Sequence, residues 1–166
     1  MAPCRDIVQP RADECGCFRH WEIDVSSVER VRNKVQRMLA DILGSVTVDK
    51  DGDFIVKHES VVVFVEVMEG FGEDGTVIDV NCPMVTDVAL KPEVYEWAAV
   101  EGHFKIGSCR IVPEEDGTGW IHFGYSIIGD DLDESELQAA IFGVMYTADG
   151  LDDELKKKFG GKLFTE

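Results

Sequence analysis

The feature that most constrains the fold is the spacing of valine residues between positions 61 and 69. Alternate positions of this stretch are valine: Val61, Val63, Val65 and Val67. Because successive side chains of a β-strand point to opposite faces, this spacing places these valines on one face of a strand. Similar runs rich in apolar and β-branched residues predict the other strands of a sheet, at residues 46–48, 54–59, 76–82, 104–112 and 120–128.

Apolar residues spaced by three and four positions predict helices before, between and after these strands. The first helix begins at Ser26, with Glu29 completing a capping box, and ends before Gly44. The second begins at Pro92, and the third begins at Asp133 and continues as one long helix because its apolar spacing is unbroken. The resulting order is a helix, three or more strands, a helix, two strands and a last helix, written α-β-β-β-α-β-β-α. It predicts an α+β fold in which helices pack on an antiparallel sheet.

The net charge restricts the partners of the chain. Its 166 residues include 33 Asp and Glu against 16 Lys and Arg, a formal net charge of −17, with 45% hydrophobic residues, enough for one globular core. Residues 1–43 are neutral, so the whole acidic excess follows them. An acidic surface repels phosphate backbones and anionic lipids, which argues against nucleic-acid and membrane partners. The spacing predicts one basic stripe, on the first helix, as a candidate for docking an acidic edge: Arg30, Lys34 and Arg37.

Residues 1–22 show no periodicity, and we expect an irregular arm there before a single domain at residues 23–166. The sequence shows neither a membrane-length apolar run nor an apolar leader. Its five cysteines form no recognisable disulfide framework, so the sequence predicts a cytoplasmic protein. In the arm, Cys15, Cys17 and His20 are a weak candidate for zinc, because no second ligand pair of matching form follows. We therefore expect no metal and no cofactor.

Two further motifs are interpreted as turns. Residues 70–75 (GFGEDG) match G-x-G-x-x-G, but a strand follows them instead of a helix, and their carboxylates would repel a phosphate. The acidic run at residues 49–53 has its glycine at the wrong position for a calcium loop. No nucleophile is paired with a base in a known pattern. The sequence therefore favours a non-enzymatic protein.

The second face of the valine-rich strand is also apolar. Val62, Phe64 and Met68 lie on it, with Glu66 as the exception, and Trp120 lies on the corresponding face of its own strand. Because a large apolar sheet face is normally covered, we expect something to lie on these side chains. The candidates are the arm or a helix of the same chain, a second copy of the chain, or a bound polypeptide.

Several segments together resemble the bacterial YbjN family, which is similar in fold to the type III secretion chaperones. These segments are GDFIV at residues 52–56, VFVEV at 63–67, TVIDV at 76–80, PMVTDV at 83–88, PEVY at 92–95 and TADGLDDEL at 147–155. The resemblance covers about residues 24–161. It implies an α-β-β-β-α-β-β-α domain, often dimeric, that binds segments of other proteins or has a regulatory role. It supplies no catalytic residues.

These observations predict a non-enzymatic, chaperone-like protein of the cytoplasm that binds a polypeptide through the second apolar face of its sheet. One alternative is a regulatory or structural homodimer that has no client and buries the same face between its subunits. A lesser alternative is a small metal-binding protein that uses the cysteines and histidine of the arm.

Overall fold

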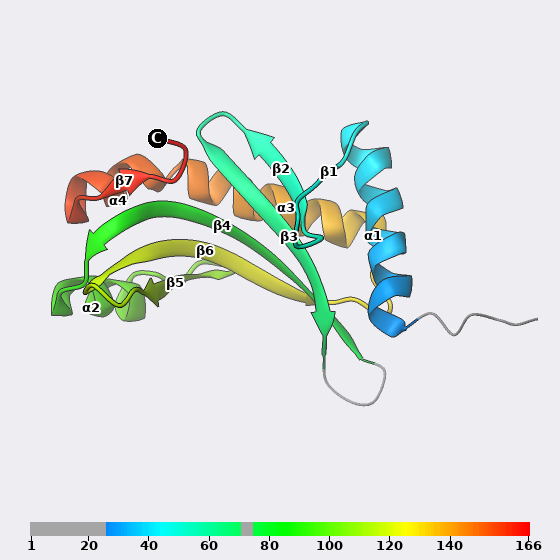
Figure 1. The fold of residues 1–166 in the computed structure, drawn as a ribbon, viewed down its shortest axis with the longest axis horizontal. Helices are drawn as coiled ribbons and strands as arrows, with labels where there is room; N and C mark the ends of the chain where they lie inside the picture. The colour runs from blue at the N-terminus through cyan, green and yellow to red at the C-terminus, as the bar shows by residue number, and fades with distance from the viewer. Residues whose placement is uncertain (1–25, 71–74) are drawn as a thin grey trace, which may run out of the picture.

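The computed structural model describes residues 26–70 and 75–166, so the predicted arm, with Cys15, Cys17 and His20, lies outside the described residues. Figure 1 shows the arrangement of the elements. The helices are α1 (Ser27–Leu43), α2 (Pro92–Val100), α3 (Glu134–Asp149) and α4 (Asp152–Phe159). The strands are β1 (Thr47–Val48), β2 (Phe54–His58), β3 (Val61–Glu69), β4 (Thr76–Ala89), β5 (Ser108–Pro113), β6 (Thr118–Ile128) and β7 (Lys162–Leu163).

Helix α1 begins and ends where the sequence predicts. The Ser26 side chain accepts a hydrogen bond of 3.2 Å from the backbone N–H of Glu29. Gly44 adopts a left-handed conformation (φ 75°), which glycine tolerates without strain and which ends the helix. The apolar positions of α1 are buried, and the helix contacts β3: Val31, Val35 and Leu39.

The strands form one antiparallel sheet with the order β1-β2-β3-β4-β6-β5, and β7 pairs with β4 beyond the residues that pair with β3. Strand β4 is longer than the sequence predicts, because it continues through Pro83 to Ala89. Pro83 has no N–H to donate to a neighbouring strand. It lies at the first of two register shifts between β4 and β6, where the ladder of hydrogen bonds is interrupted.

The sheet has an inner face, covered by α3, and an outer face on its other side. Helix α3 contacts β3, β4 and β6, and it lies behind β2 and β3 in the view of Figure 1. The inner face carries many of the fully buried side chains, among them Val63, Val65, Ile78, Val80, Ile121 and Phe123. The alternating valines therefore face the helix side of the core.

The predicted α+β order is confirmed, with β1 at the strand predicted at residues 46–48 and the two-residue strand β7 as an addition. The long helix predicted after Asp133 is instead two helices, because α3 ends at Asp149 and α4 begins at Asp152. Helix α3 starts after Asp133, as predicted, and Asp133 forms a capping box with Glu136. Leu155 keeps the apolar spacing of α3 and is buried, so the break leaves the same side of the chain facing the core.

Replacing Leu39 with Ala tests the packing of α1 on the sheet. Leu39 is fully buried, and Ala preserves helix propensity, so the change removes packing without disturbing the helix. We expect Leu39→Ala to lower the free energy of unfolding by about 2–5 kcal/mol in urea unfolding experiments. The exposed control Asp41→Ala should change this free energy by less than about 0.5 kcal/mol. If Leu39→Ala and Asp41→Ala lowered the free energy of unfolding equally, this would contradict the packing of α1 on the sheet.

Candidate functional site

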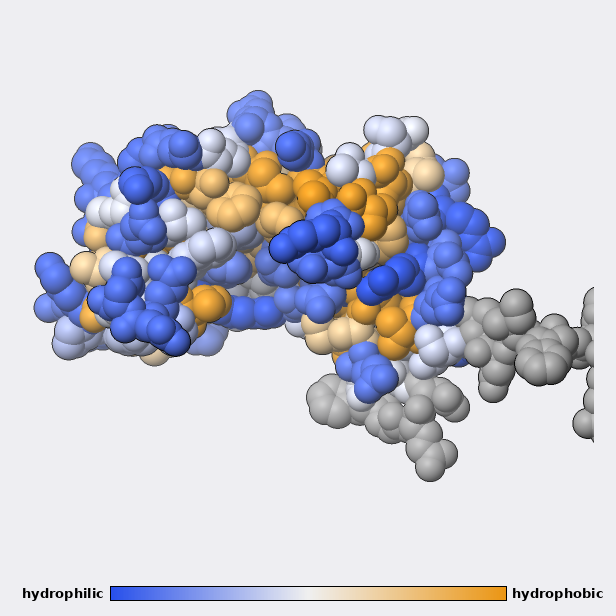
Figure 2. Space-filling model, in the orientation of Figure 1, coloured by the Kyte–Doolittle hydropathy of each residue, from blue (hydrophilic) through white to orange (hydrophobic). Residues whose placement is uncertain are grey.

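The structure places Val62, Phe64, Met68 and Trp120 on the outer face, as their alternation predicts. Each of these side chains is half-buried, whereas the inner-face valines of β3 are buried. Figure 2 shows hydrophobic side chains gathered over the β2–β3 hairpin, with hydrophilic side chains toward both ends of the molecule. The outer face therefore presents apolar surface that the core does not fully use.

A row of polar side chains crosses the outer face. Glu66 pairs in register with Asp79, and Asp79 pairs with Ser126, so neighbouring strands each contribute one polar residue. Arg110 donates hydrogen bonds to both carboxylate oxygens of Asp79 at 3.0 and 2.9 Å, and to Oγ of Ser126 at 3.2 Å. The hydroxyl of Ser126 in turn donates to Asp79. These bonds join Asp79, Arg110 and Ser126 into one hydrogen-bonded network.

Gly124 makes room for the polar row. A Cβ at this position would lie 3.0 Å from Cζ of Arg110, so the guanidinium crosses the sheet above a residue without a side chain. The register of the strands then separates the predicted site residues into two groups. Phe64 and Trp120 lie on one side of the polar row, and Met68 lies on the other.

The two carboxylates of the row have opposite pKa shifts. Burial raises the pKa of Asp79, but hydrogen bonds from Arg110 and Ser126, together with the charge of Arg110, outweigh burial and hold it below 3.8. The pKa of Glu66 is raised above 4.5, first by burial and then by the charges of Asp53 and Asp79. Asp79 and Arg110 therefore form the stable ion pair of the outer face.

An aromatic notch, formed by Phe64, Trp120 and His122, lies on one side of the row. The rings of Trp120 and His122 stack, with centroids 5.7 Å apart and planes inclined by 24°. Phe164 fills the notch, with its ring centroid 5.9 Å from those of both Phe64 and Trp120. Burial and the charge of Arg110 lower the pKa of His122, whose Nε2 is buried without a hydrogen-bond partner among the described atoms. The notch is thus an aromatic site with one unpaired polar atom.

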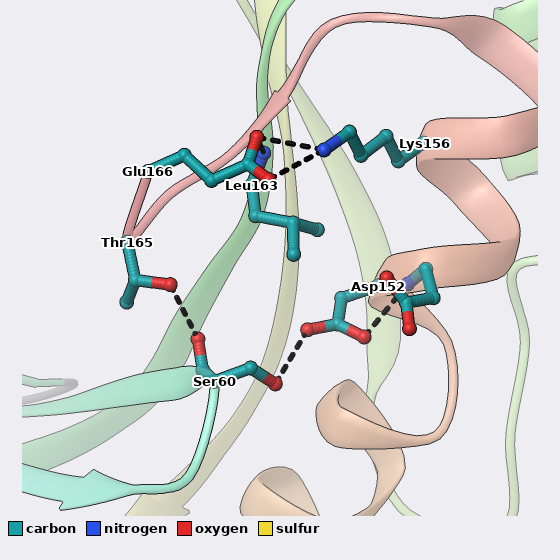
Figure 3. Close-up of polar contacts among 7 residues, drawn as sticks. Ser60, Asp152, Lys156, Leu163, Thr165 and Glu166 are labelled. Carbon is teal, nitrogen blue, oxygen red and sulfur yellow. Dashed lines mark hydrogen bonds and ion pairs between the residues drawn. The ribbon is translucent and has the colours of Figure 1, made fainter.

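Polar contacts hold residues 162–166 beside the notch, as Figure 3 shows in part. The backbone N–H of Phe164 donates to the carbonyl oxygen of Met84 at 3.1 Å. The hydroxyl of Thr165 donates to the carbonyl oxygen of Ser60 at 2.9 Å. These bonds connect the segment to β4 and to the tip of the β2–β3 hairpin.

Helix α4 supports the same segment. Nζ of Lys156 lies 2.6 and 2.7 Å from the two carboxylate oxygens of Glu166. Asp152 accepts a hydrogen bond of 2.9 Å from the hydroxyl of Ser60 and so joins α4 to the hairpin (Figure 3). None of the covers expected from the sequence included this segment, yet residues 162–166 lie on part of the outer face.

A second apolar surface, the edge groove, lies between β6 and α3 at the other end of β6. Strand β5 begins opposite Gly124, so residues 125–128 have no strand partner on that side within residues 26–70 and 75–166. The cavity there has a volume of about 600 Å³. Its lining includes the exposed apolar residues Ile106 and Ile128 and the exposed carboxylates Asp131 and Glu136.

The predicted docking stripe lies on α1, where Arg30 and Arg37 are exposed and Lys34 is half-buried. Hydrogen bonds within the first turn of α3 lower the pKa of Asp133, and the charge of Lys34 adds to this effect. Lys34 of the stripe therefore already interacts electrostatically with the acidic start of α3 in the same chain. A docking partner for Arg30 and Arg37 stays a prediction.

The described residues contain no cluster of His, Cys, Asp and Glu that could hold a metal ion, and the candidate at Cys15, Cys17 and His20 lies outside them. None of the helices in the described ranges has the length and apolar character needed to cross a membrane. Cys82 and Cys109 are free and buried, and burial raises the pKa of each to about 12. Both therefore stay protonated at neutral pH.

Comparison with known proteins identifies the family. The model of TY-Chap1, described as T3SS (YopN, CesT) and YbjN peptide-binding chaperone 1, matches residues 29–166. The chain belongs to this family, which confirms the resemblance to YbjN proteins. A search of the curated proteins finds no match.

Solved structures extend this comparison. A chain in the crystal structure of the ExsC–ExsE complex is 18% identical, with a TM-score of 0.52, and the match covers 74% of this chain and 93% of that one. The Yersinia pestis type III secretion chaperone SycH, solved in complex with a stable fragment of YscM2, is 12% identical with a TM-score of 0.49, covering 72% and 98%. The ExsC–ExsE match confirms the predicted α+β fold. The family, described as T3SS and YbjN peptide-binding chaperones, points to a non-enzymatic protein.

Replacing Asp79 with Asn tests the ion pair of the outer face. Because its pKa lies below 3.8 in the folded chain, ionised Asp79 stabilises the fold above that pH, and the contribution is lost as the pH falls through the lower folded-state value. We expect Asp79→Asn to lower the free energy of unfolding at neutral pH by about 1–3 kcal/mol. Urea unfolding across a pH series should show this difference shrinking below pH 3.8, with exposed Glu115→Gln as a neutral control. A difference that persists in strong acid would contradict this role.

Proposed function

We propose that the chain is a non-enzymatic, chaperone-like protein that binds a segment of another polypeptide on the outer face of its sheet. The observation that carries this proposal is the membership of residues 29–166 in a family described as peptide-binding chaperones. The half-buried side chains of Val62, Phe64, Met68 and Trp120 support it, because apolar surface that the core does not fully use favours contact with another molecule.

The charge of the chain supports a client that carries basic residues. A net charge of −17 attracts cationic segments and repels anionic ones. Within the outer face, Arg110 neutralises Asp79, so the aromatic notch is bordered by an ion pair rather than by an isolated charge. The client that suits this surface is an extended segment with apolar and basic side chains, since such a segment can place alternate residues on the sheet.

Replacing Phe64 with Ala tests the outer face as the binding surface. Phe64 is half-buried on β3 and contributes a ring to the aromatic notch, so its removal deletes apolar contact area with the client. We expect Phe64→Ala to weaken binding about ten-fold, since a central aromatic contact commonly contributes this much. The client is obtained by affinity capture from native lysate and mass spectrometry, and its dissociation constant is then measured by calorimetry.

The matched control is Tyr95→Ala, which also removes an aromatic ring. Tyr95 is 46% exposed on α2, a helix that contacts β5, and it is not part of the outer face. It should leave client binding unchanged, and thermal unfolding should show that both variants are folded. Unchanged client binding by Phe64→Ala would count against the outer face.

A second candidate function is self-association, favoured by the free edge of β6. Residues 125–128 lack a partner on one side within the described ranges, and an unpaired strand edge is a template for pairing with another chain. Ile128 is 71% exposed and Ile106 is 40% exposed beside this edge. We propose the edge groove, in addition to the outer face, as a surface on which two copies of the chain can meet.

Replacing Ile128 with Lys tests the edge groove as a dimer surface. A charge there would lie in the apolar contact, so we expect Ile128→Lys to convert a dimer into a monomer, measured by light scattering. Val100→Lys on α2 is the matched control, because Val100 is equally open to solvent at 72% exposure. Phe64→Asp tests the outer face in the same experiment. If light scattering shows that the original chain is a monomer, the proposal of self-association is wrong.

A further inference from the structure

Residues 162–166 contact the rest of the chain in the way a bound peptide strand does. Strand β7 pairs antiparallel with β4 at Val85 and Thr86. The N–H of Phe164 extends this pairing by donating to the carbonyl oxygen of Met84. Main-chain hydrogen bonds to a strand, with side chains placed in neighbouring pockets, are a general mode of peptide recognition.

Two backbone features of the chain determine where the segment lies. Gly161 has a φ of 87°, and a Cβ there would lie 2.3 Å from the carbonyl oxygen of Thr86, so only glycine permits this approach to β4. Asp87 has a φ of 56° and lies within the second register shift of β4. In this position its carboxylate lies 2.8 Å from Nζ of Lys162.

Alternate side chains of the segment contact three different groups. Lys162 pairs with Asp87, the ring of Phe164 lies in the aromatic notch, and Glu166 pairs with Lys156. Only Lys162 and Leu163 are extended, because the backbone N–H of Glu166 donates to the carbonyl oxygen of Leu163 at 3.1 Å and closes a turn. The contacts therefore describe a short strand followed by a turn, with a basic, an aromatic and an acidic residue at its first, third and fifth positions.

These contacts position the segment but leave it replaceable. The side chains of Lys162 and Asp87 are 67% and 50% exposed, and ion pairs this open to solvent contribute little to stability. None of residues 162–166 belongs to the buried core. Release of the segment would therefore leave the core intact while exposing the rings of Phe64 and Trp120.

We propose that the aromatic notch and residues 84–86 of β4 form a peptide-binding site, that residues 162–166 occupy it in cis, and that a client enters by displacing them. The ligand is a short strand followed by a turn, with the basic, aromatic and acidic pattern described above. This inference rests on the proposed function and assigns it a site and a class of ligand. The free chain is partly blocked by its own segment, so affinity for a client rises when the segment loses its contacts.

The test uses a fluorescent synthetic peptide, GGKLFTE, which copies residues 160–166. An opened variant of the full chain carries Lys162→Gly, Phe164→Ala and Glu166→Gln, which removes the side-chain contacts without shortening the chain. Fluorescence anisotropy should show the peptide binding the opened variant about ten-fold more tightly than the original chain. A peptide with Ala in place of its Phe should bind neither.

Two further variants separate the notch from general effects on the fold. Adding Phe64→Ala to the opened variant should abolish the gain in peptide affinity, whereas adding Tyr95→Ala should leave it unchanged. Thermal unfolding checks that the opened variant is folded. If it is not, the single variant Phe164→Ala carries the same test and should bind the peptide more tightly than the original chain.

Equal peptide affinity for the original and folded opened chains, or equal affinity for the two peptides, would overturn the inference. Reduced, carboxamidomethylated lysozyme, an unfolded chain of net positive charge, serves as a model client in the same measurements. One outcome is that the model client binds the original and opened chains with equal affinity and that the peptide also binds both equally. The proposed binding function then stands, and the assignment of the notch as the binding site is wrong. If the peptide distinguishes them while the model client binds neither, the notch stands and a general chaperone function is wrong.

Discussion

The packing of α3 on the inner face of the sheet is the constraint on which the rest of the structure depends. The alternating valines of β3 are buried beneath α3 and beside the inner-face residues of β4 and β6. A slip of one residue would turn all of them outward, so this packing determines the register of the central strands. Once the register is determined, the residues of the outer face are determined as well. The side chains of the outer face do not have to fill the core, so they can instead be suited to binding.

The outer face is divided, and the division depends on one ion pair. Asp79 lies between Glu66 and Ser126, and Arg110 reaches it across Gly124, where a Cβ would lie 3.0 Å from Cζ of Arg110. An apolar row would join the apolar side chains on its two sides into a larger hydrophobic surface, and large exposed apolar patches favour association. The ion pair instead separates the aromatic notch from the apolar side chains of Met68 and Ile128 on the other side of the row. A partner that covers both regions must therefore also match the charges of the row.

The sequence predicts the elements and the faces of side chains well, because both depend on local spacing. The cap at Ser26, the stop at Gly44 and the placement of Phe64 and Trp120 on one face follow from residues a few positions apart. The break after α3 is less predictable, because the apolar spacing that identifies a helix continues across it and Leu155 stays buried.

Long-range features of the candidate site are not predictable in this way. The contact between Asp79 and Arg110 depends on the register of three strands, and the separation of Met68 from Phe64 depends on the same register. Phe164 lies far along the chain from the rings that it covers. Its only local signal is a short apolar pair, Leu163 and Phe164, after two glycines. That signal predicts neither the strand that β7 joins nor the notch.

The overall charge is a poor guide to the notch itself. A net charge of −17 favours basic partners at long range, where the field of the whole chain acts. At contact distance one group of each sign lies outside the notch, since Asp87 and Lys156 pair with opposite charges in residues 162–166. Long-range attraction and local recognition therefore select different properties of a client. A basic segment is drawn toward the chain, but the order of basic, aromatic and acidic residues along it determines whether it can replace residues 162–166.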